Sequence, residues 1–354
     1  MVAVEGLGAG VPLVGGSYGT PAEGDASDGA FVHPMQASNA LFFSLLTYQV
    51  GRRFTRSLRV RLAYPGVGGS IPCREWRSEA GFVTTAGRGD ASFTGSIAEI
   101  YHSLLVPMIF AEPARLLAES VATADAVDIL ETAAGTGALT RELVRLGGHN
   151  IVSTDLNEPM VAAAAARLVS ERVHWQVADA QSLPFSDRSF DVVACQFGAM
   201  FLPDKVRGYA EALRVLRPNG MFAFNVWDRI ENNAVPFVIT GALCAAAPDE
   251  PLEFFRRTPY GYFDIDRIRG ELETAGFDRI TGEYIEGSSH STPESGAEAF
   301  CQGTPLRGEI ERHSSLDVES ATAIATTELR RRYGPGEFDA PIRWLQITAR
   351  RPAD

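Results

Sequence analysis

Residues 127–140 read VDILETAAGTGALT, and this stretch decides the fold. The apolar run before Glu131 predicts a buried strand, and the small residues Ala133, Gly135 and Gly137 predict a tight turn into a helix. Small side chains at such a turn let the backbone approach a ligand closely, beside the amino terminus of the helix. A glycine-rich turn alone is equally typical of a plain strand-to-helix connection, so its neighbours decide its meaning.

Strand and helix patterns alternate around this turn. Strands are predicted at 126–130, 151–154, 173–177, 190–197 and 221–227, and helices at 96–105, 112–122, 139–146, 159–171 and 204–216. Such alternation predicts an α/β protein with a doubly wound, parallel sheet. Two later strands, at 279–287 and 342–350, predict an antiparallel hairpin. The expected fold is therefore a seven-stranded, mostly parallel, Rossmann-like sheet.

The first 90 residues differ in composition from the rest of the chain. They hold 15 of the 34 glycines, and only 37–61 carries a sustained apolar pattern. We predict that 1–90 is a loosely ordered extension or a stretch upstream of the true start of translation. The domain that carries the site is expected at 91–354. It should contain helical lid insertions at about 231–275 and 288–335.

Charge and cysteine usage narrow the function. A net charge of −12 and a pI of about 5.1 argue against binding to nucleic acid and favour a small-molecule partner. The cysteines Cys73, Cys195, Cys244 and Cys301 are widely spaced, so neither a metal cluster nor a disulfide framework is expected. Reduced thiols indicate the cytoplasm. The apolar run 40–50 is too short for stable membrane insertion.

Two acids follow the next strands of the predicted sheet. Asp155 ends the second strand and Asp179 ends the third, so both should lie at the edge that carries the glycine turn. At this edge Asp155 can accept hydrogen bonds from ribose hydroxyls, and Asp179 can accept one from an adenine amino group. Each acid alone is equally typical of a helix cap or a turn. Their shared order favours a nucleoside site.

With these residues in place, the stretch from about Phe93 to Trp227 resembles the class I S-adenosylmethionine-dependent methyltransferases. The resemblance is strongest to the small-molecule branch that includes the ubiquinone and menaquinone methyltransferases. The matching motifs are the 131–137 turn, Asp155, Asp179-Ala180, Gln196-Phe197-Gly198 and LRPNG at 216–220. The resemblance implies S-adenosylmethionine as cofactor and a small-molecule acceptor whose reacting atom (oxygen, carbon or nitrogen) stays open.

The resemblance also implies which residues surround the cofactor. Glu131, Ala133, Gly135 and Gly137 would meet its methionine end, Asp155 its ribose and Asp179 its adenine amino group, with Leu156, Met160 and Ala180 beside the ring, Tyr101 closing over it and Gln196 in the following turn. The family usually has glycine where this chain has Ala133. The acceptor should lie against Gln196, Phe197 and Met200, with 257–264 and 300–307 opposite.

No residue stands out as the base that would deprotonate an acceptor. His102, His149, His290 and His313 belong to no recognisable dyad, and His102 is the best candidate only because it follows Tyr101.

Two other functions remain open. A nicotinamide-dependent oxidoreductase is disfavoured, because Thr140 stands where the last glycine of G-x-G-x-x-G belongs and the only lysine, Lys205, has phenylalanine four residues before it. A non-catalytic, methyltransferase-like binding protein would be favoured if Asp155 or Asp179 were replaced by another residue, but both are present. The oligomeric state stays open.

Overall fold

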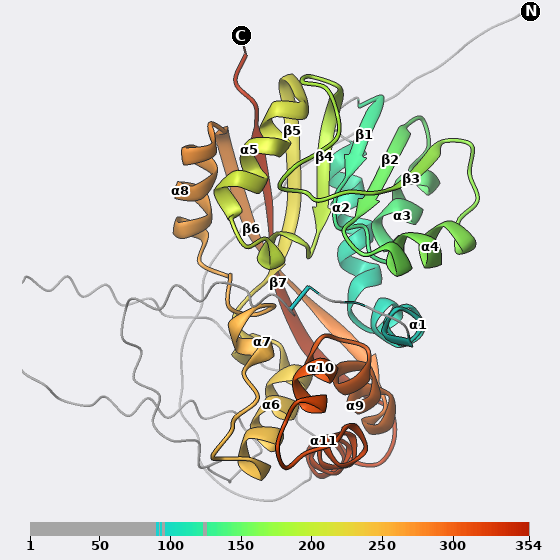
Figure 1. Cartoon of the computed structure of the whole chain (residues 1–354), viewed down its shortest axis with the longest axis vertical. Helices are drawn as coiled ribbons and strands as arrows, with labels where there is room; N and C mark the ends of the chain where they lie inside the picture. Colours follow the sequence, from blue (N-terminus) through green and yellow to red (C-terminus); the bar gives the residue numbers. More distant parts are fainter. Residues whose placement is uncertain (1–89, 92, 94–95, 123–125, 354) are drawn as a thin grey trace, which may run out of the picture. The chain divides into compact units, whose positions relative to one another are not determined.

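The computed structural model describes residues 90, 91, 93, 96–122 and 126–353, which all belong to one compact unit, Gly68–Asp354 (Figure 1). The predicted extension lies outside the described residues except for Asp90. The apolar segment 37–61 lies outside them as well.

Seven strands form one sheet in the order β3-β2-β1-β4-β5-β7-β6. They are β1 Asp128–Glu131, β2 Asn150–Asp155, β3 Val173–Val177, β4 Phe190–Gln196, β5 Leu216–Trp227, β6 Asp278–Ser291 and β7 Phe338–Arg350. The first five pair in parallel, and β7 pairs antiparallel with both β5 and β6. The predicted Rossmann-like sheet is confirmed. Its strand order reverses between β1 and β4, the place where such sheets bind ligands.

The crossover helices are α3 Ala138–Leu146, α4 Glu158–Arg167 and α5 Lys205–Val215, and α2 Ala111–Ala122 precedes β1. Helix α3 begins directly after Gly137, whose φ of 83° lies in the left-handed region that glycine adopts without strain. Asp204 caps α5, since its side chain accepts a hydrogen bond from the backbone N–H of Arg207 at 3.0 Å. The turn residues thus set where each helix begins beside the cavity described below.

A second group of helices lies beyond the carboxyl ends of the parallel strands (Figure 1). It consists of α6 Ala234–Ala246, α7 Phe254–Arg257, α9 Pro293–Gln302, α10 Leu306–Glu311 and α11 Val318–Tyr333. Strands β6 and β7 extend from the sheet into this group. Helix α8, Ile265–Ala275, belongs to the first predicted insertion, yet it packs against α5 beside the sheet. Among the described helices, none is long and apolar enough to span a bilayer.

The helices before β1 differ from the expected pair. Helix α1, Ser96–Ile100, continues into a π-helix, η1 Tyr101–Phe110, and then into α2. Hydrogen bonds from i to i+5 widen the turn to between about four and five residues. Tyr101, Leu105 and Phe110 therefore share one side of η1, and all three line the cavity.

Candidate functional site

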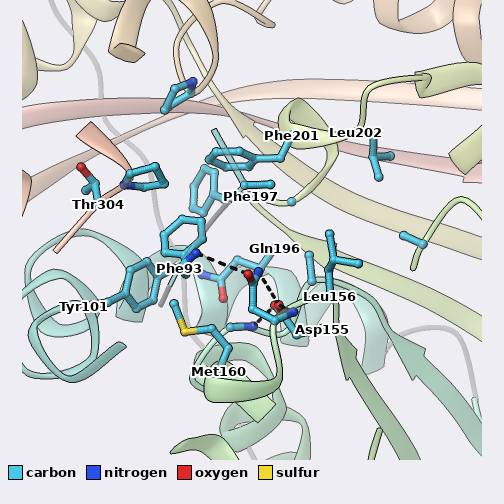
Figure 2. Close-up of a pocket in the computed structure, with 18 of the residues that line it drawn as sticks. Phe93, Tyr101, Asp155, Leu156, Met160, Gln196, Phe197, Phe201, Leu202 and Thr304 are labelled. Carbon is cyan, nitrogen blue, oxygen red and sulfur yellow. Dashed lines mark hydrogen bonds between the residues drawn. The ribbon is translucent and has the colours of Figure 1, made fainter. Parts of the chain in front are cut away.

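A cavity of about 380 Å³ opens at the carboxyl ends of β1, β2 and β4. Its strand-end side carries a polar rim, which we define as Asp155, Asn157, Asp179 and Gln181. Its other side carries an aromatic wall, which we define as Phe197, Trp227, Phe255, Tyr260 and Phe300. In Figure 2, Asp155 and Met160 lie on one side of the cavity, and Phe197 and Phe201 lie on the other.

Asp155 is the most firmly held residue of the polar rim. One carboxylate oxygen accepts the Gly135 N–H at 2.9 Å, and the other accepts the backbone and side-chain N–H groups of Asn157 at 2.8 and 3.1 Å (Figure 2). Burial raises the pKa of this carboxyl, although the hydrogen bonds oppose the rise. The hydrogen bonds fix the orientation of a carboxylate that still has lone-pair capacity for a ligand.

The glycine turn forms the floor beneath Tyr101. Gly135 has a φ of 56°, and a Cβ atom there would lie 3.8 Å from the Tyr101 hydroxyl and ring edge. Any larger side chain at this position would extend into the space between the turn and the tyrosine. The missing side chain therefore leaves the space between the backbone of the turn and Tyr101 open.

Asp179 and three apolar residues complete the rim side. The Asp179 carboxylate accepts the backbone N–H of Gln181 at 2.8 Å and is exposed to the cavity mouth. Leu156 is 56% exposed, an unusual state for leucine, and it lines the cavity together with Met160 and Ala180. These side chains offer an apolar surface of the kind that a flat ring covers.

Glu131 is not among the lining residues, although the sequence places it beside the ligand. Its side chain is buried beneath the glycine turn, on the side away from the cavity. There, one carboxylate oxygen accepts hydrogen bonds from the hydroxyls of Thr140 at 2.5 Å and Ser153 at 3.0 Å. The other oxygen is buried without a hydrogen-bond partner. Burial raises the pKa of this carboxyl to about 7. Glu131 thus joins β1, β2 and α3 from below.

Gly137 and His102 also lie outside the lining. A Cβ atom on Gly137 would lie 2.9 Å from the ring of Trp175, so this glycine allows close packing of the turn. His102 points to the turn rather than to the cavity, with its Nδ1 3.2 Å from the hydroxyl of Thr136. The structure therefore does not place His102 where it could take a proton from a bound acceptor.

The aromatic wall is a continuous series of ring contacts. Phe197 stacks on Trp227 with centroids 3.9 Å apart, and Trp227 contacts Tyr260 at 5.9 Å. Phe255 lies 6.1 Å from Tyr260 and 5.6 Å from Phe300. The two segments predicted to face the acceptor contribute Tyr260 and Phe300, together with Pro259, Thr304 and Pro305. The sequence did not predict Trp227 and Phe255 as lining residues. Trp227 could have been found, because it ends a predicted strand at the edge of the sheet that carries the cavity.

Ala91 and Phe93, two of the described residues before α1, line one side of the cavity. Asp90 is buried and accepts hydrogen bonds from Arg257 of α7 at 2.8 and 3.0 Å, and it also pairs with the Thr258 hydroxyl. Phe93 packs edge-on against Tyr101, with centroids 5.8 Å apart. Asp90, the last residue of the predicted extension, therefore belongs to the packed structure.

The ionisable groups among the described lining residues are two carboxyls and two phenols. Asp155 and Asp179 belong to the rim, and Tyr101 and Tyr260 lie farther in. Burial raises the pKa of both tyrosines, which keeps their hydroxyls neutral. Such a cavity suits a ligand with a positive charge and a second ligand with none.

Known proteins resemble the same part of the chain. The family model described as "Methyltransferase domain" matches residues 130–224. The ubiquinone/menaquinone biosynthesis C-methyltransferase UbiE of Acidiphilium cryptum is 30% identical over 172 residues, which cover 45% of this chain and 69% of the relative. The demethylmenaquinone methyltransferase of Clavibacter sepedonicus is 40% identical over 162 residues, which cover 42% of this chain and 64% of that relative.

Solved structures resemble the chain more distantly. The phosphoethanolamine N-methyltransferase 2 of Haemonchus contortus, solved with S-adenosyl-L-methionine, is 17% identical and has a TM-score of 0.47. The similarity covers 75% of this chain and 58% of that one.

Proposed function

Because the chain belongs to the class I S-adenosylmethionine-dependent methyltransferases, enzymes whose methyl donor is S-adenosylmethionine, we propose that it methylates a small, uncharged and largely apolar acceptor. The observation that carries this proposal is the aromatic wall, which has no charged side chain. The names of two relatives agree with it, since one is a ubiquinone/menaquinone biosynthesis C-methyltransferase and the other a demethylmenaquinone methyltransferase. The net charge of −12 disfavours a nucleic acid as the acceptor.

The residues on the rim side fit S-adenosylmethionine. The absent side chain of Gly135 leaves a cradle under Tyr101, where we expect the methionine portion to lie. Asp155 would accept hydrogen bonds from the ribose hydroxyls and Asp179 one from the adenine amino group, while Leu156 and Met160 would cover the ring. When bound, S-adenosylmethionine supplies an electrophilic methyl group on a positively charged sulfur.

The charges of the cavity favour this assignment. Asp155 and Asp179 place negative charge at the rim, and no arginine, lysine or histidine occurs among the described lining residues to offset it. The aromatic rings add faces that attract a cation. We expect a site with these groups to hold a cationic cofactor beside an uncharged acceptor.

The acceptor must lose its proton with little help from side chains. Tyr101 and Tyr260 are neutral, and His102 lies outside the cavity. The chain's own contribution would therefore be to bind and align the two reactants, which can supply much of the rate enhancement. We expect acceptors that ionise readily, such as phenols and quinols, to react best.

The test is methyl transfer from S-adenosylmethionine to a panel of acceptors, followed by mass spectrometry. The panel contains 1,4-naphthalenediol as the uncharged aromatic acceptor and phosphoethanolamine as the charged, non-aromatic one. We expect methylation of the naphthalenediol and none of the phosphoethanolamine. The reverse preference, or no transfer to any uncharged aromatic compound, would contradict the proposed acceptor class.

A further inference from the structure

Lys205, the only lysine in the chain, holds the turn that follows β4. Its ammonium group donates hydrogen bonds to the carbonyl oxygens of Met200, at 3.0 Å, and of Leu202. Met200 lies in the short helix η2, Ala199–Phe201, and its carbonyl cannot bond to the residue three positions on, because Pro203 has no N–H. The lysine therefore satisfies a carbonyl that the backbone leaves unpaired.

The same ammonium group contacts a second segment of the chain. It lies 5.0 Å from the ring centroid of Tyr262, close enough for a cation–π interaction. The Tyr262 hydroxyl in turn pairs with the Tyr209 hydroxyl at 2.9 Å and with the Glu271 carboxylate of α8. Tyr262 is two residues from Tyr260, a member of the aromatic wall.

Both segments that Lys205 joins line the acceptor side of the cavity. The turn after β4 contributes Phe201 and Leu202, and the second segment contributes Pro259 and Tyr260. Lys205 itself is not a lining residue. It can thus act on a bound molecule only by setting how these two segments lie relative to each other.

We propose that Lys205 is a positioning residue for the acceptor, and that its charged side chain sets the width of the cavity between the turn after β4 and the segment 259–262. The proposal rests on the proposed function for the acceptor. It does not involve the residues expected to bind the cofactor.

The charge on Lys205 does not serve folding stability. The pKa of this amine is lowered to about 8, chiefly by burial and also by the charge of Arg267, while Glu271 and Asp204 only partly compensate. Because the pKa in the fold is below the unfolded value, the charged form destabilises the fold below pH 8, and this cost disappears as the pH rises. An apolar side chain of similar length removes this cost together with the hydrogen bonds to Met200 and Leu202, so we expect the two effects to offset each other and the melting temperature to change little. This expectation separates a positioning role from a purely structural one.

The first test measures amide hydrogen exchange on the full chain with S-adenosylhomocysteine bound, and it needs no acceptor. Three variants are compared with the unaltered protein: Lys205→Met, Lys205→Arg, and Arg269→Met as a matched loss of charge on the surface of α8. For Lys205→Met we expect exchange about tenfold faster in 199–204 and 259–263, the effect of losing a hydrogen bond to a charged group. The turn 132–137 and the melting temperature should not change, and Lys205→Arg should restore part of the protection.

Two results would overturn the proposal. One is that amide exchange in 199–204 and in 259–263 is the same in Lys205→Met as in the unaltered protein. The other is faster exchange throughout the domain with a lower melting temperature, which would make Lys205 a structural residue. Since this test uses no acceptor, it distinguishes failure of the proposal from failure of the proposed acceptor class.

The second test compares KM for 1,4-naphthalenediol as the pH rises from 7 to 9.5. Lys205→Met should raise KM about tenfold at pH 7 while the affinity for S-adenosylhomocysteine changes by less than about twofold. The ratio of the two KM values should fall above pH 8, because the unaltered lysine then loses its charge. Ionisation of the acceptor cancels in this ratio. A ratio that does not change with pH would contradict the role of the charge.

Discussion

Ala133 and Phe197 both have positive φ angles, 53° and 50°, although neither is glycine. Side chains with a Cβ atom adopt this conformation at a cost of about 1 to 2 kcal/mol. The two residues stand in the turns after β1 and β4, and both line the cavity. Gly198 makes this arrangement possible, because a Cβ atom there would lie only 2.4 Å from that of Ala133. The methyl group of Ala133 is thus accommodated by a glycine 65 positions later.

Gly198→Ala should lower the free energy of unfolding by about 1 to 3 kcal/mol, the usual cost of overpacking. Adding Ala133→Gly to that variant should recover part of the loss, since it removes the contact with Ala133 and leaves the one with the Cys195 Sγ, which would lie 2.7 Å from the new Cβ atom. Denaturant unfolding of both single variants and the double variant measures this coupling. Strictly additive effects would show that the two residues do not share the space.

The buried carboxyl of Glu131 makes stability depend on pH. Its pKa in the fold, about 7, lies above its unfolded value of about 4.5, so the fold binds more protons between these values and stability decreases as the pH rises through them. Glu131→Gln should remove this decrease and should be more stable than the unaltered protein at pH 8, by on the order of 2 to 4 kcal/mol. Thermal unfolding at pH 5 and pH 8 provides the comparison. An equal pH dependence in both proteins would mean that another group causes it.

At the scale of elements, the strands and crossover helices followed from hydrophobic periodicity, but the elements that shape the cavity did not. The apolar residues of 101–110 are compatible with either an α-helix or a π-helix. Only the i to i+5 hydrogen bonding of the π-helix brings Phe110 to the same side of the helix as Tyr101. Helices α7 and α10 are four and six residues long, too short to show a period. Phe255 of α7 belongs to a wall that forms only when distant segments pack together, and α10 begins directly after Pro305, which lines the cavity.

A substitution in the aromatic wall after α7 should weaken acceptor binding and leave cofactor binding unchanged. Tyr260→Leu should raise KM for an aromatic acceptor about threefold to tenfold, because it removes ring contacts with Trp227 and Phe255. Cofactor affinity, measured by calorimetry, should stay within about twofold. Arg307→Gln is the control from the other predicted wall segment, since Arg307 pairs with Glu311 and does not line the cavity. A loss of cofactor binding in Tyr260→Leu would contradict the division between rim and wall.

For the whole molecule, the order of signals along the chain predicted the sheet, and it named two of the four rim residues, Asp155 and Asp179. Gly135, Asp155 and Asp179 lie at strand ends, and parallel strands bring their carboxyl ends to one edge regardless of the details of packing. The burial of Glu131 was not predictable, since it depends on hydroxyls 9 and 22 residues away. The contact between Asp90 and Arg257 spans 167 positions and has no local pattern.

That contact defines where the folded domain should begin. A chain starting at Gly89 retains Asp90 and Phe93, and we expect it to keep the melting temperature and cofactor affinity of the full chain. A chain starting at Ser96 loses both residues, and with Asp90 it loses the hydrogen bonds that this carboxylate accepts from Arg257, so its melting temperature should fall by about 5 °C or more. Equal melting temperatures for the two shortened chains would show that Asp90 contributes nothing to the fold.

The affinity of Asp155→Ala for S-adenosylhomocysteine, measured by calorimetry, tests most directly whether the cofactor binds at the rim. The unaltered protein should bind this product and should not prefer a nicotinamide dinucleotide. Asp155→Ala should bind it about tenfold to a hundredfold more weakly, the equivalent of about 1.5 to 3 kcal/mol for hydrogen bonds to a charged group. The surface variant Asp187→Ala should bind normally. Unchanged affinity in a folded Asp155→Ala protein, or tighter binding of a nicotinamide dinucleotide by the unaltered one, would contradict the account.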